Sequence, residues 1–197
     1  MYHPEKKFIF IHPPKCAGTS VREILRIEFE STQGGIYEPE PHWSLKEWVN
    51  YIKHTHELTS FDIKEWFVFG VIRNPFDRVL SYHEHIIRQE NPKSIFKEWV
   101  KTSLHNHYFR THTNFMNMFD YNKQLSCDYF IRQEDIENGV RGLTEKLNIQ
   151  DYELKHIRHK TKRKESDYRK SYDNKTQQII YDFFKDDIEY FGYAFEA

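Results

Sequence analysis

The sequence has few cysteines and no long apolar run. Its 197 residues include two cysteines, Cys16 and Cys127. Two cysteines do not make a disulfide framework, so we expect the reducing environment of the cytoplasm. No apolar stretch approaches the length that crosses a bilayer, and the first residues, MYHPEKKF, do not resemble a signal peptide. We therefore expect a cytoplasmic protein without a membrane partner.

The chain also lacks a net charge of one sign and any linker. Its formal net charge of -1 argues against a protein that coats polyanions, and we expect no nucleic-acid partner. Without repeats, low-complexity tracts or Gly/Ser-rich segments, the length predicts one domain over residues 1–197. Charge is nevertheless uneven. Residues 155–164, KHIRHKTKRK, are strongly basic and form either a solvated loop or part of an anion site.

What is present is an alternation of apolar strands with helical patterns. Buried strands are predicted at KFIFIH (7–12), WFVFGVI (66–72) and CDYFIR (127–132). Helices are predicted at about 19–30, 44–54, 93–104, 109–119, 135–147 and 173–190, and a further helix is predicted to begin at Pro75. Strands separated by helices imply parallel crossovers, so the expected fold class is α/β, a three-layer parallel sheet flanked by helices.

The loop HPPKCAGTS, residues 12–20, joins the first strand to the first helix. Such a turn aims backbone N–H groups and the positive end of the helix dipole at one point. Gly18 allows a close approach of a ligand, and Lys15 adds a mobile full charge. Thr19 and Ser20 add hydroxyl donors. We expect an anion site, the alternative being a plain turn.

Two other kinds of site fit this loop less well. An ATP or GTP site needs a lysine directly after the second glycine of the loop, whereas Lys15 precedes Gly18. A cysteine phosphatase needs C-x5-R, which Cys16 and Arg22 satisfy. In that case, however, two prolines separate the cysteine from the strand, and no general-acid segment is present.

A second candidate anion site lies in VIRNPFDRVLSYHEH, residues 71–85. Arg73 stands at the carboxyl end of the second buried strand, where ligands collect in open α/β sheets. Asn74 caps the following helix, Pro75 is its first residue, and Ser81 lies one to two turns inside. Two phosphate sites without a metal-binding Asp suggest a nucleotide that carries anions at both its 3′ and 5′ ends.

Together these segments resemble the PAPS-dependent sulfotransferases, especially the carbohydrate branch, where PAPS is 3′-phosphoadenosine 5′-phosphosulfate. HPPKCAGTS is similar to the 5′-phosphosulfate loop of that family, and VIRNPFDRVLSYH to its 3′-phosphate segment. The stretches that begin at Asp128 and Ser171 are similar to its later strand-helix unit and its closing helix. The resemblance implies a P-loop nucleotide-hydrolase-like fold, PAPS as donor, adenosine 3′,5′-bisphosphate as product and no metal.

The resemblance also assigns roles to residues. Lys15 would neutralise charge on the bridging oxygen as the sulfur–oxygen bond breaks, and Cys16 would be a bystander in place of a common Thr. Arg73 and Ser81 would bind the 3′-phosphate. The implied cofactor-binding residues are Lys15, Cys16, Ala17, Gly18, Thr19, Ser20, Arg73, Ser81, Lys160 and Arg163, the last two from the basic segment.

HWSLKEW, residues 42–48, is similar to the segment that carries the family's general base. This implies that His42 activates a hydroxyl of the acceptor. Glu47 is a weaker candidate for the base and is expected to be a helix cap, three residues after Ser44, or a partner that orients the base. The acceptor is expected to be a glycan or another small alcohol, and aromatic residues lining its cleft would suit a sugar ring. The alternative from another class is a non-catalytic nucleotide-binding module of the same fold.

Overall fold

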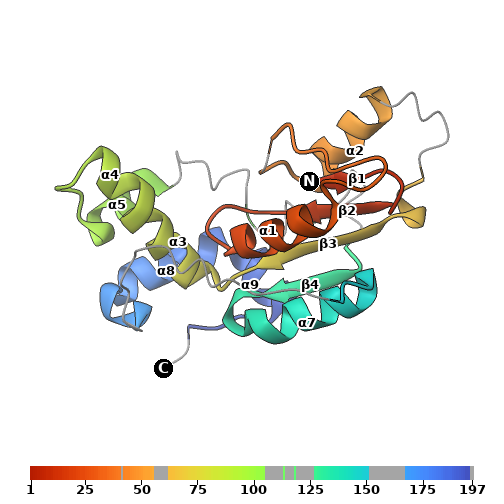
Figure 1. Cartoon of the computed structure of the whole chain (residues 1–197). Coiled ribbons are helices and arrows are strands. Elements are labelled where there is room, and N and C mark those ends of the chain that lie inside the picture. Colours follow the sequence, from red (N-terminus) through yellow and green to blue (C-terminus); the bar gives the residue numbers. More distant parts are fainter. Residues whose placement is uncertain are drawn as a thin grey trace. The chain divides into compact units, whose positions relative to one another are not determined.

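The computed structural model describes residues 1–40, 42–55, 62–104, 113, 118, 127–150 and 167–195. These residues form two compact units (Figure 1). Unit 1 takes those within Met1–Ile72 and Met116–Ile157, and unit 2 takes those within Arg73–Phe115 and Arg158–Ala197. The single domain over residues 1–197 stays a prediction. No helix in the described ranges is both long enough and apolar enough to cross a membrane.

Unit 1 is built on a four-stranded sheet in the order β1-β2-β3-β4. The strands are β1 (Tyr2–His3), β2 (Phe8–Ile11), β3 (Phe67–Ile72) and β4 (Tyr129–Arg132). The three strands predicted from apolar runs are parallel, with Phe8 opposite Phe67 and Phe69 opposite Tyr129. β1 is antiparallel to β2 and was not predicted. The sheet is therefore mixed and mostly parallel, as the α/β fold class requires.

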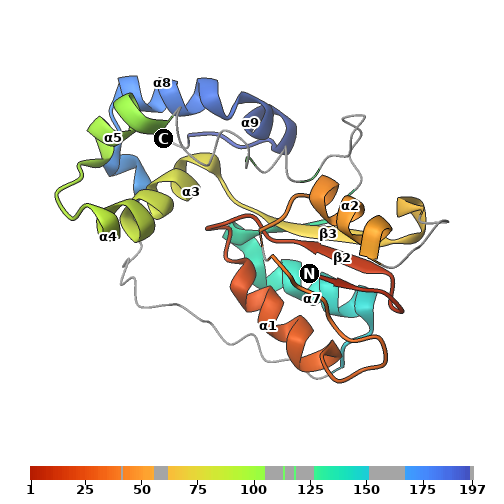
Figure 2. The same cartoon turned by 90° about the horizontal axis from the view of Figure 1, so that it is seen from above.

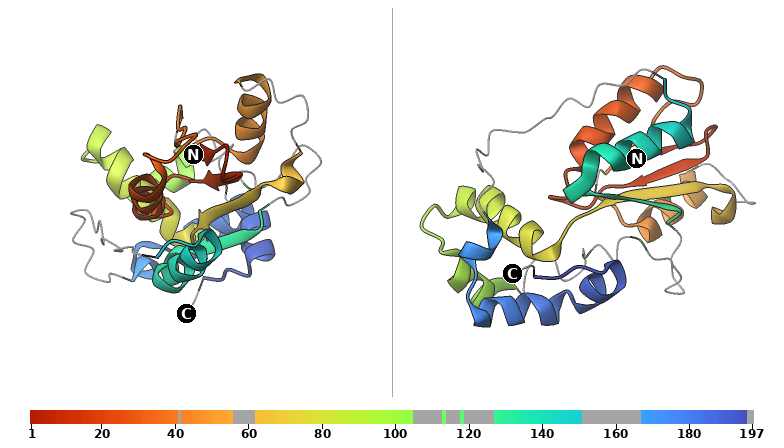
Figure 3. Two further views of the ribbon diagram at one scale, coloured as in Figure 1. Left: turned by 45° about the vertical axis from the view of Figure 1, so that its right-hand side comes forward. Right: turned by 90° about the horizontal axis from the view of Figure 1, so that it is seen from below.

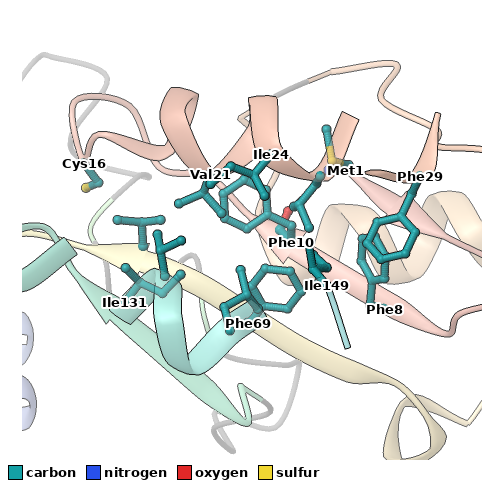
Figure 4. Packing of buried hydrophobic residues seen from close by; sticks show 14 residues of the cluster. Met1, Phe8, Phe10, Cys16, Val21, Ile24, Phe29, Phe69, Ile131 and Ile149 are labelled. Atoms are coloured by element: carbon teal, nitrogen blue, oxygen red, sulfur yellow. The ribbon is translucent and has the colours of Figure 1, made fainter. Parts of the chain in front are cut away.

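Helices cover both faces of this sheet. α1 (Gly18–Phe29) and α7 (Ile136–Leu147) lie on one face and α2 (Leu45–Thr55) on the other, as Figure 2 and the view from below in Figure 3 show. The face under α1 and α7 holds a cluster of buried side chains (Figure 4). Its members are Met1, Phe8, Phe10, Cys16, Val21, Ile24, Leu25, Phe29, Phe69, Val71, Ile131, Val140, Leu143 and Ile149. Unit 1 thus has the predicted three layers.

Sequence spacing explains the two helices nearest the loop. In α1, Val21, Ile24 and Leu25 are buried at the i, i+3, i+4 spacing of one helix face. At the start of α2, the Ser44 amide donates to the Glu47 carboxylate (2.7 Å), and the Glu47 amide donates to the Ser44 hydroxyl (3.4 Å). This reciprocal pair is the predicted capping box, so Glu47 serves as a cap.

Unit 2 is helical. It comprises α3 (Pro75–Tyr82), a π-helical turn (His83–Ile87), α4 (Arg88–Glu90), α5 (Phe96–Ser103), α8 (Asn174–Phe183) and α9 (Lys185–Phe191). α5 and α8 pack side by side (Figure 2). Its core includes Phe76, Trp99, Tyr172, Ile180 and Phe184. Short 3₁₀ turns occur at Ile63–Glu65 and Gln133–Asp135 in unit 1 and at Tyr168–Ser171 in unit 2.

The predicted helices differ from the structure in two places. The closing helix, expected to run over 173–190, is divided at Phe184, whose φ of -108° and ψ of 27° are not helical. Phe184 is buried in the core of unit 2, so tertiary packing fixes a break that no proline or glycine marks. The helix expected over 109–119 lies almost entirely outside the described residues.

Candidate functional site

The loop between β2 and α1 contains two residues in the left-handed region. Lys15 has a φ of 65° and Ala17 a φ of 63°, values that residues other than glycine rarely adopt. Such backbone persists where the surroundings impose it, often at ligand sites. Ala17 is the N-cap of α1, and its methyl side chain has no group that could accept a hydrogen bond from the first turn. The start of a twelve-residue helix is thus left without a cap, which favours an anion.

Gly18 begins α1 and lies against the ring of His12. A Cβ at residue 18 would collide with that ring, so glycine is required by packing as well as by any approach of a ligand. His12 is 6% exposed and its ring stacks on Phe10 with centroids 5.7 Å apart. Its Nδ1 is buried and has no hydrogen-bond partner among the described residues. Burial lowers the pKa of His12 to about 3, with smaller contributions from His42, the N-terminal amine and Arg22.

His42 lies beside His12, thirty residues away in the chain. Its Nδ1 is 2.9 Å from the backbone carbonyl oxygen of His12. The two rings meet edge to face, with centroids 5.0 Å apart and an interplanar angle of 68°. His42 is half-buried, as is Lys15. The predicted base and the predicted 5′ loop therefore belong to the same unit and are linked through His12.

Cys16 is fully buried at one end of the core cluster (Figure 4). Its Sγ donates to the carbonyl oxygen of Pro14 at 3.8 Å. Arg22, the other half of the C-x5-R pattern, donates from Nε to the carboxylate of Glu38 at 2.6 Å. The thiol thus packs in the core and the guanidinium faces a carboxylate. This is the opposite of the arrangement that a cysteine phosphatase needs, in which both groups contact one anion.

The start of α3 holds the second predicted group. The Asn74 side chain accepts from the Phe76 amide at 3.1 Å, and Pro75 is the first residue of the helix, both as predicted. Arg73 is 12% exposed and donates to the Asp77 carboxylate from Nε at 2.8 Å. Ser81 lies in the same helix and is half-buried. Asp77 therefore orients Arg73, a role that the spacing of four residues could have indicated.

The structure brings some of the predicted residues together within each unit. Lys15, the loop residues 16–20 and His42 lie in unit 1, whereas Arg73 and Ser81 lie in unit 2. Lys160 and Arg163 lie outside the described residues. Within the described ranges, no three His, Cys, Asp or Glu side chains are placed to hold a metal ion. The expectation of a metal-free site stays a prediction.

Two contributors were not predicted from the sequence, His12 and Asp77. The signal for Asp77 was available, since an acid one turn after Arg73 at a helix start is a common ion pair. No local signal pointed to His12 as the partner of His42, because thirty residues separate them. That contact exists because the end of β2 and the segment before α2 meet in the fold.

Comparison with known proteins identifies the family. No curated protein matches the chain, and no solved structure matches it. A family model described as the Sulfotransferase family matches residues 1–194. The match covers nearly the whole chain and agrees with the loop, the strand-end arginine and the α/β sheet described above. The chain therefore belongs to the sulfotransferase family, whose enzymes take a sulfonate group from PAPS and place it on an acceptor.

Proposed function

We propose that this protein transfers sulfonate from PAPS to a hydroxyl group of a carbohydrate or another small alcohol. The observation that carries the proposal is the start of α1, which has no side-chain cap and follows the left-handed residues Lys15 and Ala17. Successive amides in such a turn form a concave donor set for an anion. His42 belongs to the same unit, so an anion site and a candidate base are available together.

The residues of the loop suit a phosphosulfate. Lys15 supplies a full positive charge, and the exposed Thr19 and half-buried Ser20 supply hydroxyl donors at the first turn of α1. PAPS supplies the sulfuryl group and a leaving group that ends in a 5′-phosphate. A sulfuryl group carries less negative charge than a phosphoryl group, so cationic and amide donors suffice to neutralise the charge that develops. We assign to Lys15 the donation to the bridging oxygen as its bond to sulfur breaks.

The 3′-phosphate is assigned to unit 2. A guanidinium binds phosphate oxygens in a fixed geometry, and Asp77 holds that of Arg73 in one orientation. Ser81 adds a hydroxyl from the same helix. Lys160 and Arg163, from the basic segment, are further candidates for this phosphate. This assignment predicts a preference for nucleotides that carry a 3′-phosphate.

We assign the binding of the acceptor to the surface next to His42. Trp43 follows the candidate base and is half-buried. Its ring packs against Trp48 and Tyr51, with centroids 5.1 and 5.2 Å apart. A partly exposed aromatic ring that is fixed by contacts with other rings can serve as a platform for the apolar face of a sugar. We therefore favour a carbohydrate hydroxyl, although the chemistry is the same for another alcohol.

The test measures nucleotide binding and transfer separately. Thermal shift is recorded with adenosine 3′,5′-bisphosphate, ATP and inorganic phosphate on the wild type and on Lys15→Ala, Arg73→Ala and Cys16→Ser. Transfer of radiolabelled sulfonate from PAPS is then measured with a panel of polysaccharides, monosaccharides and simple alcohols. We expect stabilisation by the bisphosphate above all, and transfer to at least one carbohydrate. Stabilisation by ATP alone, or loss of activity confined to Cys16→Ser, would contradict the proposal.

A further inference from the structure

The contact between His42 and His12 determines where the proton of the His42 ring sits. The Nδ1 of His42 lies 2.9 Å from the backbone carbonyl oxygen of His12. A carbonyl oxygen only accepts hydrogen bonds, so the bond exists when Nδ1 carries the hydrogen. A neutral imidazole has one N–H, and its other nitrogen then holds the lone pair. In the neutral ring of His42 that nitrogen is Nε2.

The group that accepts this bond is held in place. His12 directly follows β2, and its ring is packed between the stacked Phe10 and the start of α1 at Gly18. The ring of His12 also contacts the ring of His42 edge to face. His42 is thus fixed by a hydrogen bond and by a ring contact, both from one buried residue. Partners of this kind fix the tautomer and orientation of functional histidines elsewhere.

We propose that the His12 carbonyl is a positioning group that holds His42 in the Nδ1–H tautomer, so that Nε2 is the atom that takes the proton of the acceptor. This inference rests on the proposed role of His42 as general base. In the step, a lone pair of the acceptor oxygen forms the new bond to sulfur, and the hydroxyl proton passes to Nε2. The bond between sulfur and the bridging oxygen breaks, and its electron pair remains on the 5′-phosphate.

The charge balance of the pair supports this role. When Nε2 takes a proton, His42 becomes an imidazolium, and its Nδ1–H bond to the carbonyl strengthens because the donor is then charged. Burial keeps the neighbouring His12 ring neutral at ordinary pH, since it lowers the pKa of that ring to about 3. No positive charge from His12 therefore opposes the imidazolium.

The tautomer is read directly by long-range ¹H–¹⁵N correlation spectra of the full chain labelled with ¹⁵N, recorded at alkaline pH, where imidazole rings are neutral. The signals of His42 are identified by their loss in His42→Asn or, independently, in His42→Gln. We expect a protonated-type shift at Nδ1 and a lone-pair-type shift at Nε2. A protonated Nε2, or averaged shifts at the two nitrogens, would overturn the inference.

Activity separates this inference from the proposed function. Both His42→Asn and His42→Gln lack a base, and we expect each to lower kcat by about 10²-fold or more. Unchanged kcat in both would remove His42 as the base, while the spectra would still report its tautomer. His54 offers a matched control, since its Nδ1 lies 2.6 Å from the Asn50 carbonyl oxygen and its side chain is on the exposed face of α2. His54→Asn is expected to leave kcat unchanged.

Discussion

The two helices that follow the parallel strands β2 and β3 begin in opposite ways. α1 starts at Gly18 after two left-handed residues, and no side chain caps it. α3 starts at Pro75 with the Asn74 side chain bound to its second amide, and Asn74 also donates to the Ala194 carbonyl oxygen at 3.0 Å. One helix start is left open, and the other is closed by its own residues.

If both helix starts bind phosphate, as we propose, the difference implies two ways of doing so. At α1 we expect backbone amides of the loop to bind the anion, and the two left-handed residues there carry local strain. The Ser20 amide of this first turn donates to the Ala17 carbonyl oxygen at 3.3 Å. At α3 the Phe76 amide is bound by the Asn74 side chain, so we expect an anion to be held there by side chains such as Arg73, which Asp77 orients. We therefore expect the first region to control turnover and the second to control recognition and stability.

The largest effect is expected from Lys15. Lys15→Ala removes the only side-chain charge of the loop 12–20, and we expect kcat to fall by about 10²- to 10³-fold, as when one donor to a transition-state oxygen is lost. Because Lys15 is half-buried in a loop, the melting temperature of the Lys15→Ala protein without ligand should differ little from that of the wild type. The measurement is steady-state kinetics with PAPS. Lys6→Ala, an exposed lysine of unit 1, is the control, and equal losses in both variants would refute the assignment.

Arg73 should affect recognition more than turnover. Arg73→Lys keeps the charge but loses the planar fork, and we expect affinity for adenosine 3′,5′-bisphosphate to fall by about 1.5–3 kcal/mol. Affinity for adenosine 5′-phosphosulfate, which lacks the 3′-phosphate, should stay unchanged. Isothermal titration calorimetry measures both.

Two further variants test the role of Arg73, one with a smaller expected effect and one as a control. Asp77→Asn should weaken binding of the bisphosphate in the same direction by a smaller amount, because Arg73 keeps its charge but loses its orienting carboxylate. Arg88→Lys, on the exposed surface of α4, should change neither affinity. A parallel loss of affinity for both nucleotides in Arg73→Lys would assign Arg73 to structure and not to the 3′-phosphate.

The two helix starts should also differ in stability. Asn74→Ala removes the cap of α3 and the part-buried hydrogen bond to the Ala194 carbonyl oxygen, and we expect the free energy of unfolding to fall by about 2 kcal/mol. Ala17→Gly relieves a left-handed residue at the start of α1 and should raise that free energy by up to about 1 kcal/mol. Urea unfolding measures both. A destabilised Ala17→Gly would mean that the open start is not strained.

A last effect concerns the pH dependence of stability. Burial lowers the pKa of His12 to about 3 and that of His83, in unit 2, to about 4. Below the ordinary histidine pKa of about 6.5 the unfolded chain binds protons that the folded chain does not, so stability falls as the pH falls. His12 alone should contribute about 1.4 kcal/mol per pH unit in that window. Urea unfolding between about pH 6.5 and 5 should show a shallower slope in His12→Gln. An unchanged slope would show that His12 is protonated in the folded chain.

The sequence predicted those parts of the fold that depend on local patterns. Three apolar runs became the parallel strands, and the spacing in Asn74-Pro75 and in Ser44-x-x-Glu47 marked two helix starts correctly. β1 was not predicted because a strand of two residues is too short to show a hydrophobic periodicity. Its position depends on pairing with β2. The break at Phe184 depends on burial in the core of unit 2, which a local pattern does not express.

The candidate site was predictable residue by residue but not in its contacts. Lys15, Arg73 and His42 could be named from motifs, because each motif is contiguous. The left-handed backbone at Lys15 and Ala17 could not be predicted, because both residue types disfavour it and only the folded loop imposes it. The His12–His42 bond could not either, because it joins segments that meet only after the sheet has formed.

The burial of both thiols has a practical consequence. Cys16 lies in the core cluster, and Cys127 lies 3.3 Å from the sulfur of Met118 with a thiol pKa raised by burial. A water-soluble alkylating reagent can reach either sulfur only when unit 1 opens locally, so the rate of alkylation of the native enzyme reports the rate of that opening. The single-thiol variants Cys127→Ser and Cys16→Ser report the opening around Cys16 and around Cys127 separately. A nucleotide that binds the loop should slow the alkylation of Cys16 more than that of Cys127.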